Sequence, residues 1–468
     1  MARPLVSGDR AVRAADRAAR GAERSSRGRD GRRAVARVPR AVAHRVRGRG
    51  GLDRARARLP APAVAPVRGR RAARDRGPRR SGLPVRAAAT RRRPMTAQVS
   101  EQPVAVGAPA RKPERLHGLD MLRVLASCLV VFGHIAAYFT LSHQHWWLTD
   151  WVENELVGSL HLNANLGFLG VCTFLMISGV VVTHVTAREG PGTFLYRRVS
   201  RLLPLLWVIT PLVWLLIDFG LQVSSTHDPH LGFGDLLSGM VLTNFFQTPQ
   251  VGLVGVTWTL WMQIIFYCYV AAAIPLLRRI PWLAPTIMAA ICFVTILFST
   301  LSRNSTTGSL HMWAHQLGQW AVYLPVLCIG QLISLVHTRA VHRYAALAIG
   351  AVHVLLFVWA DRIGGFTFQG NAMPRTLLVV TAVVLLMMRA NGRISRSKVI
   401  AGWSRRTYAI YLVHLACLYP LMNALVPRVG PELAVLAGLA ATALVSDLLH
   451  RFVEMPAERF LRTRRKRS

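Results

Sequence analysis

The stretch LDMLRVLASCLVVFGHIAAYF, residues 119–139, decides the fold class, because it is long and apolar enough to cross a bilayer as a helix of about 20 residues. It nevertheless carries Asp120, Arg123 and His134. Ionisable side chains are costly inside a membrane and usually face a protein interior or a water-filled path. Arg123 and His134 are eleven positions apart, so at about 100° per residue they share one helix face, roughly 16 Å apart along the axis. Asp120 and Arg123, three positions apart, are placed to pair.

Charge and hydrophobicity occupy different parts of the 468-residue chain, which is 52% hydrophobic yet has a net charge of +37. Residues 1–94 contain 29 Arg and six acidic residues, and no Phe, Tyr, Trp or Ile. Such a segment cannot bury enough apolar surface to offset its conformational entropy, so we expect it to be disordered.

Three interpretations of residues 1–94 remain open. The segment could be a basic tail that binds nucleic acid or anionic lipid. It could be a targeting peptide, although it has neither an apolar core nor a Ser-rich amphipathic pattern. The interpretation we favour is upstream sequence translated from a GC-rich genome, with the true start at Met95 and a polar N-terminal tail over 95–114. On that interpretation no nucleic acid partner is expected.

The remainder of the chain predicts an all-α membrane protein, a bundle of about ten transmembrane helices. The candidate spans are 119–141, 166–186, 202–223, 255–277, 283–301, 318–336, 344–360, 376–391, 407–426 and 432–453. A further apolar stretch, LLSGMVLTNFF in the segment 224–254, is too short to span and is expected to lie at the interface or to re-enter.

The charge of the connecting segments predicts the orientation. Alternate connections and the C-terminal tail carry twenty Lys and Arg residues, whereas the opposite connections carry four. Basic loops stay in the cytoplasm, so both termini, including the basic tail 461–468, are expected to be cytoplasmic.

The six cysteines each lie in an apolar run, without a CxxC pair or a His partner at metal-ligand spacing. This pattern favours six buried small hydrophobic residues over disulfides or a zinc site, and no metal is expected.

Six motifs in order along the chain resemble those of the acyltransferase-3 family of integral membrane O-acyltransferases. RLHGLDMLRVLASCLVVFGH resembles the first-span signature, in which an Arg and a His separated by ten residues are both needed for acyl transfer. The other five are GFLGVCTFLMISG (167–179), FLYRRVSRLLP (194–204), WTLWMQIIFY (258–267), SRRTYAIYLVH (404–414) and FVEMPAERF (452–460). The resemblance covers about 115–460.

The resemblance implies that an acyl group, expected to be acetyl, passes from acyl-CoA to a hydroxyl of a carbohydrate or glycoconjugate. It implies no bound cofactor, and a multi-pass protein of a bacterial plasma membrane. The catalytic candidates are His134, Arg123 and Asp120. An imidazole near neutral pKa suits a general base, which fits His134.

Further candidates follow from the matched motifs. Arg197, Arg198 and Arg201 could bind the phosphates of the donor, or could be ordinary positive-inside charge. Candidates for the acceptor site or channel are Ser178, Trp258, Gln263, Tyr408, Tyr411 and His414. For Ser178 close helix packing is the competing interpretation, and for the Tyr and His residues it is hydrogen bonding within the bundle.

The chain departs from the family pattern at two positions. It has Cys172 where Asp or Pro is frequent, and Gln263 where Glu is frequent. A neutral amide at 263 casts doubt on a carboxylate role in that span, but it could still hold an acceptor or orient His134.

Two other functions compete with acyl transfer. A transporter or flippase of an envelope precursor would use a buried Arg and His equally well. Transporters often show internal repeats, and none is evident between the two halves of this chain. A non-catalytic scaffold for envelope assembly would not need the Arg–His pair.

Overall fold

The computed structural model describes residues 117–163, 165–222, 231–247, 251–305, 308–364, 373–390 and 392–465, and every structural statement below concerns these residues. They all belong to the second of the two units into which the chain divides, 102–468. The predictions for 1–94 and for the tail 95–114 lie outside the described residues.

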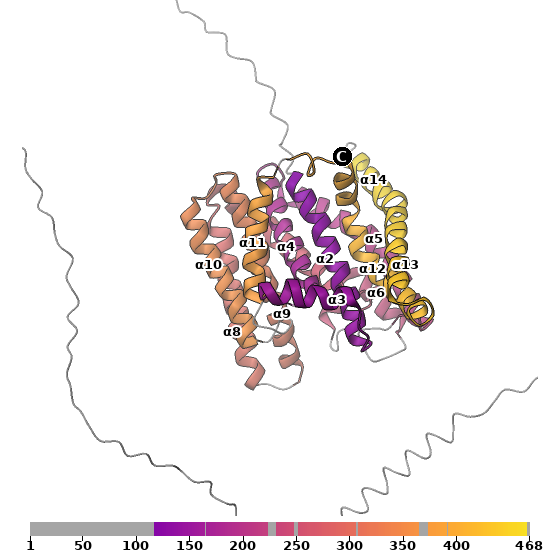
Figure 1. Ribbon diagram of the computed structural model, residues 1–468. Coiled ribbons are helices and arrows are strands. Elements are labelled where there is room, and N and C mark those ends of the chain that lie inside the picture. Colours follow the sequence, from indigo (N-terminus) through magenta and orange to yellow (C-terminus); the bar gives the residue numbers. More distant parts are fainter. Residues whose placement is uncertain are drawn as a thin grey trace, which may run out of the picture. The chain divides into compact units, whose positions relative to one another are not determined.

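Throughout its described part the chain is helical and without strands, which confirms the all-α prediction (Figure 1). The principal helices lie side by side and run between the two ends of a bundle. In chain order the elements are α2 (His117–Leu141), α3 (Trp147–Trp151), η1 (Val152–Gly158), α4 (Leu166–Val185), α5 (Pro191–Asp218), α6 (Phe233–Val241), η2 (Thr243–Phe246), α7 (Thr257–Arg279), α8 (Leu283–Ser305), α9 (Ser309–His337), α10 (Arg343–Trp359), η3 (Ala360–Gly364), α11 (Met373–Met388), α12 (Lys398–Val429), α13 (Pro431–Leu449), η4 (His450–Glu454) and α14 (Met455–Arg465).

Nine helices of the described residues are long and apolar enough to cross a membrane, and α11 is a shorter apolar helix. Each of the ten predicted spans coincides with one of these helices, so the prediction of about ten transmembrane helices is confirmed. Large apolar side chains such as Leu125, Leu355 and Leu444 are exposed on the outside of the bundle. In a bilayer these side chains face lipid, which is as apolar as they are.

The predicted start lies nine or more residues too late at three helices. α5 begins at Pro191 rather than at 202, α9 at Ser309 rather than at 318, and α12 at Lys398 rather than at 407. Pro191 occupies the first helical turn, where its missing N–H costs nothing. Ser397 caps α12 by accepting a hydrogen bond from the Val399 N–H at 3.2 Å. Hydropathy marks where an apolar run ends, whereas α5 and α12 continue through the neighbouring basic residues, so their basic motifs are helical and not loops.

The apolar stretch within 224–254 forms two short helices, α6 and η2, and does not span, as predicted. α6 lies against α5, where the Trp207 indole N–H donates to the Met240 carbonyl at 3.2 Å. Residues 223–230 and 248–250 of this connection lie outside the described residues.

Glycines allow α4 to pack closely against two neighbours. A Cβ at Gly179 would lie 2.0 Å from the Leu327 carbonyl oxygen of α9, and one at Gly330 would lie 2.1 Å from the Met176 carbonyl oxygen of α4. On the other side, a Cβ at Gly133 of α2 would lie 2.3 Å from the Gly167 nitrogen. Small residues at such crossings are the usual means of close helix packing in membranes.

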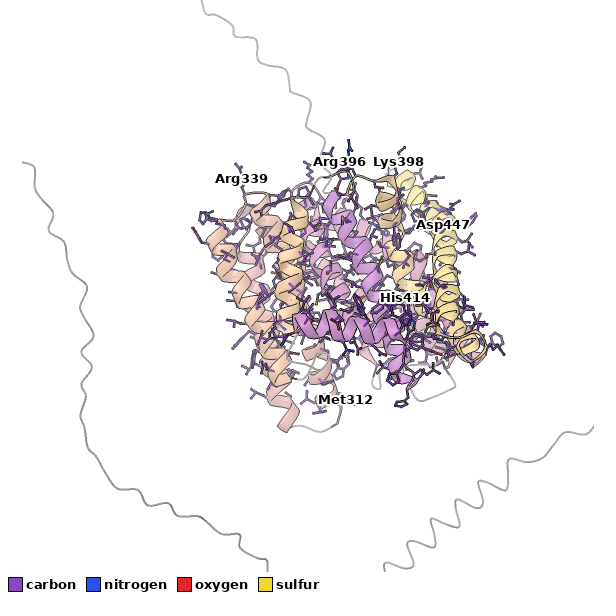
Figure 2. The ribbon with its side chains drawn as sticks, in the orientation of Figure 1. Met312, Arg339, Arg396, Lys398, His414 and Asp447 are labelled. Carbon is purple, nitrogen blue, oxygen red and sulfur yellow. The ribbon has the colours of Figure 1, made fainter. Side chains whose placement is uncertain are left out.

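Basic residues of the connecting segments gather at one end of the bundle. Arg339, Arg396 and Lys398 lie at that end and Met312 lies at the other (Figure 2). This arrangement agrees with the charge asymmetry of the sequence, while the side of the membrane on which each end lies stays a prediction.

All six cysteines are unpaired, but the prediction that all are buried is wrong for two of them. Cys172, Cys292 and Cys328 are buried and Cys417 is partly buried, whereas Cys128 and Cys268 are exposed. Apolar residues lie on both the lipid-facing and the protein-facing side of a transmembrane helix, so hydropathy alone does not separate the two sides.

Candidate active site

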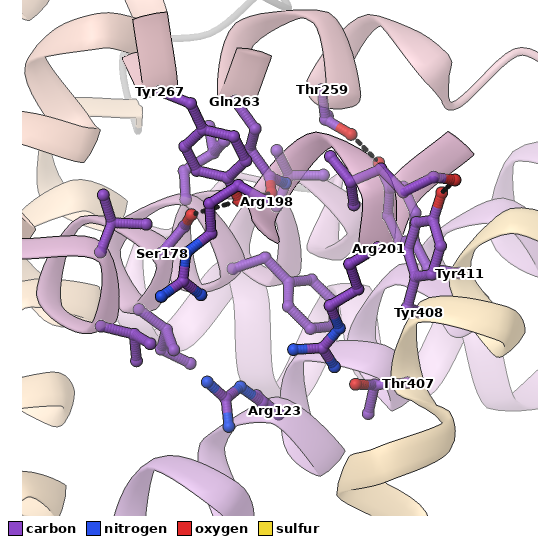
Figure 3. Close-up of a pocket in the computed structure, with 17 residues that line it drawn as sticks. Arg123, Ser178, Arg198, Arg201, Thr259, Gln263, Tyr267, Thr407, Tyr408 and Tyr411 are labelled. Carbon is purple, nitrogen blue, oxygen red and sulfur yellow. Dashed lines mark hydrogen bonds between the residues drawn. The ribbon is translucent and has the colours of Figure 1, made fainter. Parts of the chain in front are cut away.

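Five helices surround a cavity of about 150 Å³ inside the bundle, shown in Figure 3. The lining residues come from α2, α4, α5, α7 and α12. The polar and charged ones are Arg123, Ser178, Arg198, Arg201, Thr259, Gln263, Tyr267, Thr407, Tyr408 and Tyr411. Seven of these ten were candidates from the sequence.

Three arginines from two helices converge on the cavity. Arg123 projects from the first third of α2, and Arg198 and Arg201 project from α5 (Figure 3). Arg198 and Arg201 are three positions apart, so the helical part of the basic motif directs both side chains to one face. Had this segment been a loop, as predicted, its backbone would not have fixed that register.

Carboxylates balance two of the three arginines in part. Arg123 Nη1 lies 3.1 Å from Asp120 Oδ1. Arg201 lies at 4.0 Å from a Glu454 oxygen and at 3.9 Å from a Glu458 oxygen, which are loose contacts for ion pairs. A guanidinium presents five N–H donors in a planar fork that matches phosphate and carboxylate oxygens. Because its contacts with Glu454 and Glu458 are loose, Arg201 keeps N–H donors that can bind an anion in the cavity.

Arg198 has a different environment. Its guanidinium lies 5.7 Å from the centre of the Phe194 ring, and its buried Nε has no hydrogen-bond partner among the described residues. A cation that rests on an aromatic face keeps its in-plane donors available. Together with Arg123 and Arg201, it makes the cavity suited to a multiply charged anion.

Asp120 does not line the cavity but holds one of its arginines. The residue is 6% exposed, and besides pairing with Arg123 its carboxylate accepts a hydrogen bond from the Ser404 hydroxyl of α12 at 2.8 Å. Asp120 therefore links the beginning of α2 to the beginning of α12 and fixes Arg123 at that junction.

One wall of the cavity is a chain of neutral hydrogen bonds. The Tyr267 hydroxyl donates to Gln263 Oε1 at 3.0 Å, and the Ser178 hydroxyl lies 3.4 Å from the Tyr267 oxygen. Since Tyr267 uses its proton on Gln263, Ser178 is the donor of the second bond. Ser178 thus lines the cavity, whereas its neighbour Gly179 makes the close helix packing against α9.

Tyrosines of α12 line the opposite wall. The Tyr408 hydroxyl donates to the Leu202 carbonyl at 2.7 Å, and the Tyr411 hydroxyl lies 2.7 Å from the Thr259 hydroxyl of α7. Both side chains are therefore held in place. Of the two, Tyr411 lies further along α12, in the direction of His414.

His134 and His414 lie behind this wall and do not line the cavity. The two rings are 5.0 Å apart between centroids, with planes tilted by 46°. The His414 ring is in turn 6.0 Å from the ring of Tyr411. Tyr411, at the wall of the cavity, therefore lies between the arginines and the two imidazoles.

A family model described as an acyltransferase domain matches residues 116–451 of the chain. The chain belongs to the acyltransferase-3 family. The comparisons with curated proteins and with solved structures gave no match. Membership of the family implies a membrane acyltransferase, which needs an acyl substrate and an acceptor as well as a bilayer.

Two candidates of this acyltransferase-3 protein lie away from the cavity. Arg197 forms an ion pair with Glu189 and does not line it. Trp258, one residue before the lining residue Thr259, packs on Tyr323 with ring centroids 4.7 Å apart. The roles predicted for both residues stay predictions without support from the cavity.

The sequence interpretation missed three polar residues of the cavity, Thr259, Tyr267 and Thr407. Tyr267 had a signal, since it is four positions after Gln263 and so lies on the same face of α7. Glu454, which lies in the last matched motif, is buried. Its second oxygen pairs with His450 at 2.8 Å, so it anchors η4 as well as facing Arg201.

Proposed function

We propose that this acyltransferase-3 protein transfers an acetyl group from acetyl-CoA to a hydroxyl of a carbohydrate or glycoconjugate, with His134 as general base. The observation that carries the proposal is the convergence of Arg123, Arg198 and Arg201 on one cavity inside a membrane bundle. The donor carries several phosphates, and arginine is the side chain best suited to bind them.

In the proposed reaction, donor binding and acyl transfer take place at different positions along α2 and α12. The donor phosphates bind at the arginine end, and the thioester extends towards Tyr411 and the imidazoles behind it. The acceptor hydroxyl attacks the thioester carbonyl, so a C–O bond forms and the C–S bond breaks. His134 takes the hydroxyl proton and returns it to the thiolate of CoA.

The remaining part of the proposal concerns the orientation of the protein in the membrane. Basic connections lie at the arginine end of the bundle, and we place that end in the cytoplasm of a bacterial cell, where acyl-CoA is made. The acceptor is then a carbohydrate of the cell envelope, and residues that hold it include Ser178 and Gln263.

The test uses membranes that contain the protein, radiolabelled acetyl-CoA and extracted envelope carbohydrate. We expect His134→Ala to lower transfer by about 10²–10⁴-fold, the usual contribution of a general base. His342→Ala is the matched control, because His342 is an exposed histidine at the beginning of α10.

Transfer by the wild type that does not exceed that of His134→Ala, for any acyl-CoA and acceptor tried, would contradict the proposal. Movement of unmodified carbohydrate across the membrane by the same protein would point instead to a flippase.

A further inference from the structure

His414 is a buried histidine whose ring is fixed by its own helix. Its exposed fraction is 0%, and its Nδ1 lies 2.8 Å from the Tyr411 carbonyl and 3.2 Å from the Ile410 carbonyl. Carbonyl oxygens only accept hydrogen bonds, so Nδ1 carries the hydrogen. The Nε2 atom of the neutral ring is therefore a lone-pair acceptor.

This Nε2 is buried and has no hydrogen-bond partner among the described residues. Buried polar atoms are nearly always paired, and an exception in a native protein calls for an explanation such as a catalytic role. The proposed reaction does not yet use His414, so its unpaired atom needs a partner.

The nearest imidazole is that of His134, and the separation suits a hydrogen bond. A ring nitrogen lies about 1.2 Å from its ring centre, so an N–H···N bond of about 2.9 Å spans roughly 5 Å between two centres. The observed centroid distance is 5.0 Å, with a tilt of 46°. Catalytic hydrogen bonds are often poorly aligned without substrate, and rotation of one ring aligns this one.

The two rings differ in how firmly they are held. The ring of His414 is tied to two backbone carbonyls, whereas His134 is tied to α12 at its backbone, where the Tyr419 hydroxyl donates to its carbonyl at 3.4 Å. The groups of α12 that contact His134 are thus His414 and Tyr419, while Tyr411 contacts His414 and Tyr138 of α2 contacts Tyr419. The fixed ring of His414 can therefore orient the ring of His134.

We propose that His414 is a positioning residue whose Nε2 accepts the N–H of His134, so that the other nitrogen of His134 presents its lone pair to the acceptor hydroxyl. This inference rests on the proposed role of His134. The hydroxyl proton moves to the exposed nitrogen of His134 and from there to the CoA thiolate. The shared N–H stays between the rings, and His414 does not take up the proton, as the orienting partner of the catalytic histidine in the Ser-His-Asp triad does not.

The first experiment compares two substitutions in the full-length protein. His414→Gln keeps a side-chain acceptor, whereas His414→Leu has a similar volume without one. We expect His414→Leu to lower kcat by about 10- to 100-fold with an unchanged KM for acetyl-CoA, and His414→Gln to restore most of kcat. Equal kcat values for the Gln and Leu variants would overturn the proposal.

The second experiment needs no activity. The protein is labelled with ¹⁵N-histidine in detergent, and the His134 signals are identified by their loss in His134→Ala. We expect one tautomer of His134 in the wild type and in His414→Gln, and a mixture of tautomers in His414→Leu. A mixture in the wild type overturns the proposal, even where the Leu variant does not fold.

The matched control is His353→Leu. His353 of α10 is also buried, with one ring nitrogen 3.0 Å from the Pro285 carbonyl and the other unpaired among the described residues. We expect this control to leave the His134 tautomer unchanged. The expected tautomer pattern in a protein that transfers no acyl group would contradict the proposed function while supporting the arrangement of the two histidines.

Discussion

Arg198 is the most informative of the three cavity arginines at the scale of single residues. Arg123 has Asp120 as a direct partner, and Arg201 has two acidic neighbours, whereas Arg198 rests on the Phe194 ring. The proposed donor site therefore has one arginine whose removal leaves none of these carboxylates without its partner, which makes its substitution the cleanest to interpret.

We expect Arg198→Gln to raise the KM for acetyl-CoA by about 10- to 100-fold with a smaller change in kcat, because a hydrogen bond to a charged group contributes about 1.5–3 kcal/mol. Steady-state kinetics with varied acetyl-CoA measure both quantities. Arg405→Gln, an exposed arginine of α12 that does not line the cavity, is the control. An equal effect of the two substitutions would show that general positive charge, and not the cavity, binds the donor.

A second residue-scale prediction concerns the contact between Ser404 and Asp120. Ser404→Ala removes the 2.8 Å hydrogen bond and leaves Asp120 paired with Arg123. We expect a loss of about 1.5–3 kcal/mol in the free energy of unfolding, since the acceptor is a buried carboxylate. Thermal or denaturant unfolding in detergent measures it. Ser395→Ala, which removes a local bond to the Gly392 carbonyl, should cost clearly less.

At the scale of helices, the contact between α4 and α9 allows little change. A methyl group at Gly179 would meet a backbone carbonyl and not a flexible side chain, so the two helices would have to separate. α4 also carries Ser178 and much of the apolar wall of the cavity, and a shift of α4 would therefore alter the site.

We expect Gly179→Ala to destabilise the protein by about 1–3 kcal/mol, the usual cost of overpacking, and to lower activity. Gly192→Ala is the matched control, because a Cβ at Gly192 meets nothing within 4 Å and alanine is the better helix former. The unfolding midpoints of the two variants in the same detergent decide the matter, and a Gly179 variant as stable as the control would contradict the prediction.

The helices were predictable from the sequence, but the beginnings of α5, α9 and α12 were not. Hydropathy located every span, yet α5 and α12 continue beyond their apolar runs through the basic motifs. The site was predictable to the extent that motifs named its residues, as with Arg201, Gln263 and Tyr411. The contact between the rings of His134 and His414 was not, because no local pattern relates residues on α2 and α12 that meet only after folding.

At the scale of the whole molecule, the basic end can be assigned to a side of the membrane. Arg339 and Met312 lie at opposite ends of the bundle and both are exposed (Figure 2). We expect Met312→Cys to react with a membrane-impermeant maleimide in intact cells, and Arg339→Cys to react only after permeabilisation.

The labelling needs a background in which all six native cysteines are replaced, because Cys128 and Cys268 are exposed on the bundle. The reverse labelling pattern would place the arginine end of the cavity outside the cytoplasm. In that case the proposed donor could not be cytoplasmic acyl-CoA.

α12 has a consequence for how the two substrates influence each other. One helix without an internal proline before Pro420 carries Ser404 at the arginine end and His414 at the imidazole pair. On the proposed function, a displacement of this segment when one substrate binds would be transmitted to the site of the other. Thermodynamic linkage then requires reciprocity: by whatever factor bound acetyl-CoA changes the affinity for the acceptor, bound acceptor changes the affinity for acetyl-CoA.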